Sequence, residues 1–124
     1  MLRLIFLVRW LRSPLGIVAS NVSTRMASTE KEVAARRFVV RGRVQGVGFR
    51  WFVEREAHIL GIAGWVRNNH DGSVEVLAQG SPDQLSGLRS RLREGPRAAR
   101  VDDVAESEIK PKDGLSSFRI EGAW

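Results

Sequence analysis

The chain has 124 residues, of which 43% are hydrophobic and 27% charged, a composition that fits one small globular domain and excludes two. It contains no cysteine, so disulfide frameworks, thiolate metal sites and cysteine nucleophiles are excluded. The two histidines, His58 and His70, do not have the spacing of a metal motif, so we interpret both as surface residues and expect neither a metal nor another cofactor.

The formal charge of +6 would suit a nucleic-acid partner, but its distribution argues against one. The first 29 residues contain four arginines and no acidic residue, which leaves 16 basic and 14 acidic residues, a net charge of +2, for the rest of the chain. A duplex-binding surface is usually more strongly basic than this. We therefore expect no nucleic-acid partner.

The N-terminal segment is apolar but interrupted by arginines. Its early uncharged run, Leu4 to Val8, is shorter than the core of a secretory signal and cannot span a bilayer, so we expect no membrane association. Two interpretations stay open: an organellar transit peptide, or, as we favour, translation that begins at Met26. We expect residues 1–33 to be an extension outside the fold and residues 34–124 to form a domain that works in the cytoplasm.

Residues 37–60 predict a strand followed by a helix. Hydrophobic and basic residues alternate from Arg37 to Val44, as in a half-buried strand. Apolar residues then recur at helical spacing from Phe49 to Leu60, and Gly61 is placed to end the helix in a left-handed conformation. Trp51 in this helix and Trp65 after it are interpreted as packing residues.

Two short strands are expected next, over residues 62–68 and 73–79. The turn between them contains Asp71-Gly72, a strong hairpin signal, so the two strands should pair in antiparallel fashion.

The rest of the chain predicts a second helix and two strands. Residues 81–84 read Ser-Pro-Asp-Gln, which matches a capping box with proline at the first helical position, and Gly95-Pro96 ends the helix at about Glu94. Residues 100–109 and 117–120 read as strands. The resulting βαββαβ order predicts an α+β, ferredoxin-like sandwich with two helices on one face of an antiparallel sheet.

Residues 42–50, GRVQGVGFR, join the first strand to the first helix. A strand that turns through glycines into a helix leaves amide groups unpaired at the positive end of the helix dipole, where anions bind. Gly46 and Gly48 allow positive φ angles, and Arg50 can offer two parallel donors to phosphate oxygens. A Walker loop or a dinucleotide fingerprint fits the sequence less well. A tight turn with a solvated Arg50 would explain the glycine spacing alone equally well.

Two motifs resemble the acylphosphatase family: VRGRVQGVGFR, Val40 to Arg50, and GWVRN, Gly64 to Asn68. The resemblance covers about Arg36 to Ile120 and is supported by Gly72 to Val76, Gly95-Pro96 and Phe118 to Ile120. It implies a ferredoxin-like enzyme that hydrolyses the carboxyl-phosphate mixed anhydride without a metal or a covalent intermediate.

The resemblance also implies roles for individual residues. Arg50 would be the catalytic arginine that binds the phosphate, and Asn68 would hold the attacking water. By itself, Asn68 would be read only as part of the turn that follows it. The substrate would be a small acyl phosphate, inorganic phosphate would be the product and a competitive inhibitor, and the chain would act as a monomer. The amides around the phosphate would come from Gln45, Gly46, Val47, Gly48 and Phe49.

Two other functions are compatible with this topology. RNA-recognition motifs share this topology but stack bases on aromatic residues of their central strands, whereas residues 72–79 read GSVEVLAQ without an aromatic residue. A related domain also forms part of larger carbamoyl-transfer maturation proteins, whose further domains a chain of 124 residues cannot contain. The sequence therefore favours a free-standing enzyme.

Overall fold

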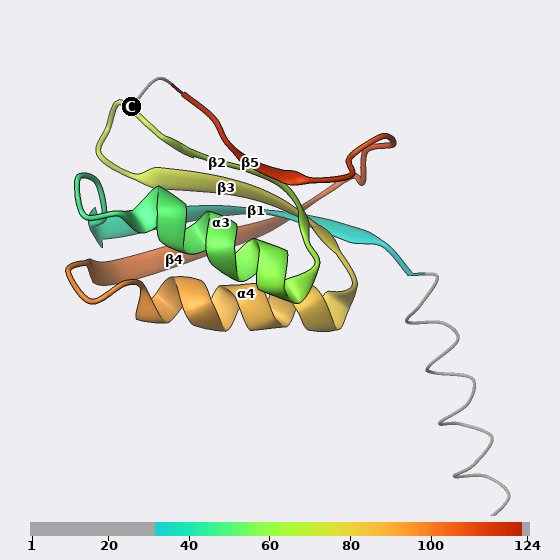
Figure 1. Ribbon diagram of the computed structural model, residues 1–124, viewed down its shortest axis with the longest axis horizontal. Helices are drawn as coiled ribbons and strands as arrows, with labels where there is room; N and C mark the ends of the chain where they lie inside the picture. Colours follow the sequence, from blue (N-terminus) through green and yellow to red (C-terminus); the bar gives the residue numbers. More distant parts are fainter. Residues whose placement is uncertain (1–31, 123–124) are drawn as a thin grey trace, which may run out of the picture. The chain divides into compact units, whose positions relative to one another are not determined.

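A computed structural model describes residues 32–122 (Figure 1). The expectation for residues 1–33 falls almost wholly outside this range. The strands and helices follow each other in βαββαβ order with a short fifth strand at the end, as the sequence predicted. The elements are β1 (Ala34–Arg43), α3 (Phe49–Leu60), β2 (Ala63–Asn68), β3 (Val74–Gly80), α4 (Pro82–Glu94), β4 (Arg100–Ile109) and β5 (Phe118–Ile120).

The five strands form one sheet in the order β4-β1-β3-β2-β5. The first four pair in antiparallel fashion, and both helices lie on one face of the sheet, which confirms the ferredoxin-like prediction (Figure 1). The short β5 differs, because it adds to the edge of β2 in parallel. The sheet is therefore mixed, with an antiparallel centre.

Local sequence signals fix the helix ends. Gly61 ends α3 with φ 76°, a left-handed conformation that glycine adopts at little cost. The capping box of α4 is complete, since Ser81 Oγ accepts from the Gln84 amide at 3.2 Å and Gln84 Oε1 accepts from the Ser81 amide at 2.8 Å. Neither helix of the described residues is long and apolar enough to cross a membrane.

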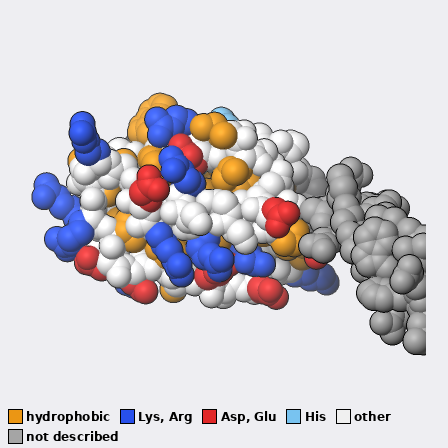
Figure 2. All heavy atoms as spheres, turned by 90° about the horizontal axis from the view of Figure 1, so that it is seen from below, with side chains coloured by type: hydrophobic (Ala, Val, Ile, Leu, Met, Phe, Trp, Pro, Cys, Tyr) orange, Lys and Arg blue, Asp and Glu red, His pale blue; other side chains and the backbone are white. Residues whose placement is uncertain are grey.

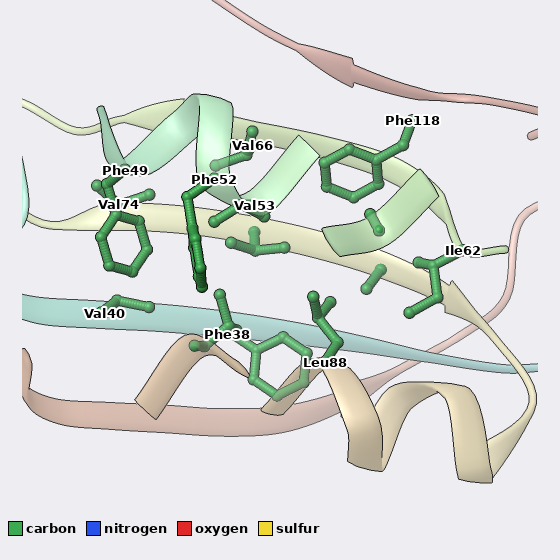
Figure 3. Packing of buried hydrophobic residues seen from close by; sticks show 14 of the residues in the cluster. Phe38, Val40, Phe49, Phe52, Val53, Ile62, Val66, Val74, Leu88 and Phe118 are labelled. Atoms are coloured by element: carbon green, nitrogen blue, oxygen red, sulfur yellow. The ribbon is translucent and has the colours of Figure 1, made fainter. Parts of the chain in front are cut away.

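The hydrophobic core fills the space between the sheet and the two helices (Figure 3). Phe38 and Val40 on β1, and Val44 directly after the strand, are fully buried in this core, as the alternation predicted. The packing role expected for Trp51 is wrong, because 70% of this side chain is exposed on the outer surface of α3. Trp65 is half-buried, and the Arg67 guanidinium lies 4.6 Å from its ring centre.

The opposite face of the sheet carries a buried carboxylate, Glu75, which bridges Arg37 on β1 and Arg67 on β2. Burial of Glu75 opposes ionisation, but the hydrogen bonds donated by the two guanidinium groups outweigh it, so the pKa of this carboxyl lies below its ordinary value. The bridge joins three neighbouring strands and is formed only while Glu75 is ionised.

Candidate active site

The loop between β1 and α3 has the backbone geometry that the sequence predicted. Gly46 has φ 73° and Gly48 has φ 77°, both in the left-handed region. A Cβ atom added at either position would meet no atom within 4 Å, so both glycines face open space. Left-handed residues that alternate with a residue of ordinary φ, as Val47 is here, curl the chain so that its amides can point into one concavity.

The first turn of α3 is open to an anion. Within the described residues, no side chain caps this helix at Gly48, and the first turn contains no acidic residue. The hydrogen bonds of the described residues also include none donated by the amides of residues 46–51. The contrast with α4, whose N-terminus is closed by its capping box and by Asp83 in the first turn, singles out α3 as the end where a dianion can bind.

Arg50 is the second residue of α3 and is half-buried. Its Nη1 atom lies 3.9 Å from the position of a Cβ added at Gly122, so the side chain extends toward the segment that follows β5. That segment is fixed to β2, because the Glu121 amide donates to the Val66 carbonyl at 2.8 Å. Within residues 32–122, no ion pair occupies the Arg50 guanidinium, which leaves its donors for a ligand.

Asn68 is the last residue of β2, is half-buried, and lies opposite Val74 of β3. The strand ends here because the chain turns back through residues 69–73, where the Asn69 amide donates to the Ser73 carbonyl at 2.9 Å. This turn and the loop of residues 44–48 lie at the same end of the molecule (Figure 1, left).

Gln45 joins the glycine loop to the β2–β3 turn. Its side-chain Nε2 donates to the carbonyl oxygens of Asn69 at 2.8 Å and of Ser73 at 2.9 Å. The structure thus ties the glycine loop to the turn that begins directly after Asn68. Of the other loop residues, Phe49 is buried in the core and Val47 packs against it, so only their main-chain groups can face a ligand.

The turn is held together by a second set of hydrogen bonds. The Asp71 carboxylate accepts from the Ser73 hydroxyl at 2.6 Å and from the Ser73 amide at 3.0 Å, and Arg41 donates to its other oxygen at 3.0 Å. These bonds, those of Ser73 above all, lower the pKa of Asp71 to about 2. Sequence reasoning found the turn but missed the side-chain roles of Gln45 and Ser73.

The charge around this end favours an anionic ligand. Several Lys and Arg side chains gather at the left end of the molecule in Figure 2, the end that holds the glycine loop. Arg43, at the end of β1, and Arg97, in the loop after α4, are both exposed there. Such a cluster raises the local concentration of anions and speeds their association.

Comparisons with known proteins agree on one family. The family model described as acylphosphatase matches residues 36–120. An acylphosphatase from Koribacter versatilis is 56% identical over 100 residues, which are 81% of this chain and 91% of the relative. The solved acylphosphatase of Coxiella burnetii is 40% identical with a TM-score of 0.71, over 77% of this chain and all of the other. That of Bacillus subtilis is 39% identical with a TM-score of 0.69, over 72% and 99% of the two chains.

Proposed function

The chain belongs to the acylphosphatase family and is an enzyme that hydrolyses acyl phosphates, and we propose that it does so by direct attack of a water molecule on the phosphoryl group. In this mechanism the main-chain amides of residues 45–49 and the Arg50 guanidinium bind the phosphoryl oxygens. Asn68 holds the attacking water. The observation that carries the proposal is the uncapped N-terminus of α3 joined, through Gln45, to the turn beside Asn68.

The leaving group explains why so few side chains suffice. Hydrolysis releases a carboxylate whose conjugate acid has a pKa of about 4, so it departs as the anion and needs no proton donor. Negative charge spreads over the equatorial phosphoryl oxygens as the bond to the leaving group breaks. Amide groups and a guanidinium that already point at those oxygens stabilise this charge without reorganising.

Asn68 can orient water but cannot deprotonate it. Its carbonyl oxygen accepts a hydrogen bond from water, while its amide nitrogen can donate only to another acceptor. Its contribution is therefore the alignment of the water with the phosphorus and the leaving oxygen. We propose that the proton of the water passes to the phosphoryl group of the substrate.

The cradle, the guanidinium and the carboxamide all belong to one chain, so we propose that the monomer is the active form. Inorganic phosphate presents the same oxygens as the substrate and is therefore expected to be a competitive inhibitor. No step of this mechanism uses a metal.

The direct test is hydrolysis of benzoyl phosphate by the purified chain with a chelator present. We expect turnover that the chelator leaves unchanged and that inorganic phosphate inhibits competitively. Loss of activity in the chelator, restored by a divalent cation, would contradict the mechanism. An absence of turnover under all conditions would contradict the function itself.

A further inference from the structure

The side chain of Gln45 forms a link to which the proposed mechanism assigns no role. Its amide nitrogen carries two hydrogens, and each finds a carbonyl oxygen of the β2–β3 turn, on Asn69 at 2.8 Å and on Ser73 at 2.9 Å. The partners lie 24 and 28 residues away along the chain. The link is therefore tertiary, and it joins the loop that would hold the phosphate to the turn that follows Asn68.

The turn behaves as one unit in these contacts. Its two ends are joined by the bond from the Asn69 amide to the Ser73 carbonyl, and the Asn69 side chain donates to Ser73 Oγ at 3.1 Å. Asp71 closes the tip through its bonds with Ser73. A group that grips both ends of such a turn fixes the position of the whole turn, and with it the strand end at Asn68.

A second side-chain connection reaches the turn from β1 and is weaker. Arg41 reaches Asp71 from β1, but both side chains are more than half exposed, and an exposed ion pair contributes little. Gln45 itself is half-buried, and its two hydrogen bonds run from the loop that precedes α3 to the β2–β3 turn. Of the contacts seen in the described residues, those of Gln45 connect the two halves of the candidate site most directly.

We propose that Gln45 is a positioning residue, whose side chain sets the distance between Asn68 and the phosphate cradle. The inference rests on the proposed function, since it gives Gln45 an effect only through the water held by Asn68. Small displacements of an aligned group are costly in rate: a shift of about 1 Å can cost about a hundredfold. The backbone amide of Gln45 and its side chain would then have different roles. The amide would face the phosphate, and the side chain would face the turn.

The side chain at this position needs both donors and length. Glutamate would set an acceptor against two carbonyl oxygens, and asparagine is shorter by one methylene group and would not reach both. Methionine matches glutamine in length and flexibility but donates no hydrogen bond. Gln45→Met therefore removes the link with little change of volume, and Gln45→Asn keeps the donors while shortening their reach.

The chain supplies a matched control in Gln79. Its Nε2 donates to the Lys112 carbonyl at 2.8 Å, and its Oε1 accepts from the Lys112 amide at 2.9 Å, so it also ties a strand to a distant segment. These bonds lie in the exposed part of the structure and connect β3 to the segment after β4. Gln79→Met thus removes two hydrogen bonds of similar length without touching the candidate site.

The test is a double-mutant cycle with Gln45→Met and Asn68→Ala in the full chain. The kcat for benzoyl phosphate and the inhibition constant for inorganic phosphate are measured for each variant, with a chelator present. We expect Gln45→Met to lower kcat by about tenfold or more, with the phosphate inhibition constant nearly unchanged. In the Asn68→Ala background the same substitution should have almost no further effect. Gln79→Met should leave both constants unchanged.

Three results would overturn the inference. The first is an equal loss of kcat from Gln45→Met in both backgrounds, which would show that Gln45 acts independently of Asn68. The second is a rise in the phosphate inhibition constant as large as the fall in kcat, which would assign the side chain to the cradle. The third is full activity of the single Asn68→Ala variant, which would also refute the proposed role of that residue and so identifies which proposal failed. If Gln45→Met does not fold, Gln45→Asn takes its place in the same cycle with the same expectations.

Discussion

Replacing Gly46 by alanine separates the conformational role of the glycine loop from its role in binding. Gly46 has φ 73°, and a Cβ atom added there meets no atom within 4 Å, so the substitution creates no clash. The remaining cost is that of holding an L-residue in the left-handed region, about 1–2 kcal/mol. In a domain of this size each kcal/mol lowers the Tm by about 4–8 °C, so the Gly46→Ala variant should unfold about 4–16 °C below the parent chain.

Gly114 provides the control for that strain. It has φ 87° and equally open surroundings, but it lies in the connection between β4 and β5, at the end of the molecule away from the glycine loop (Figure 1). Gly114→Ala should therefore lower the Tm by a similar amount. Thermal unfolding followed by circular dichroism compares the two variants.

Only the loop variant should lose phosphate affinity. A strained loop that misaligns one amide loses a hydrogen bond to a charged oxygen, about 1.5–3 kcal/mol, which weakens inhibition by inorganic phosphate about tenfold or more. The inhibition constant is measured on benzoyl phosphate hydrolysis at a temperature where both variants are folded. A Gly46→Ala variant that lost stability as expected but bound phosphate as tightly as Gly114→Ala would refute a role of this loop in phosphate binding.

Three further predictions follow from individual contacts. Arg50→Gln should weaken phosphate inhibition about tenfold or more, because a charge-assisted hydrogen bond is lost. Arg55→Gln removes the same charge from the same helix and should change the inhibition little. Equal effects of the two substitutions would argue against a direct contact between Arg50 and the phosphate. Because the pKa of Glu75 is lower in the folded than in the unfolded chain, its contribution to stability is present above its ordinary pKa of 4.5 and is lost as the pH falls through the folded value. Urea unfolding should therefore show a steeper loss of stability between about pH 5 and about pH 3 in the parent chain than in Glu75→Gln, and parallel curves would refute this. A chain that begins at Met26 should keep the Tm and the activity of the full chain, because the core of the described part lies between Ala35 and Phe118, and a loss of either would give residues 1–25 a role in the domain.

Much of the fold could be predicted from local sequence signals. The bounds of α3 follow from the helical spacing and from the left-handed glycines at both ends, and those of α4 follow from the capping box and from Gly95. These features depend on residues close together in the sequence, so the sequence alone reveals them. The parallel addition of β5 depends on a partner more than fifty residues earlier in the chain, which no local pattern encodes.

The candidate site likewise has features that local sequence predicts and features that depend on tertiary contacts. The glycines and Arg50 are neighbours in sequence, so the anion-binding loop could be predicted from a short stretch. The side-chain bonds of Gln45 could not, because they require the register that sets the β2–β3 turn against the loop. For Trp51, residue type alone gave a wrong prediction. Tryptophan favours burial, but the position of this one on the outer side of α3 leaves it exposed.

The most direct measurement is the fate of oxygen from the solvent. Benzoyl phosphate is hydrolysed by the chain in water enriched in the heavy oxygen isotope, and both products are analysed by mass spectrometry. Attack of water on the phosphorus places the heavy oxygen in inorganic phosphate and leaves the benzoate unlabelled, which is the expected result. Heavy oxygen in the benzoate would mean attack on the carbonyl carbon, and a phosphate-binding loop that aligns water with the phosphorus could not explain it.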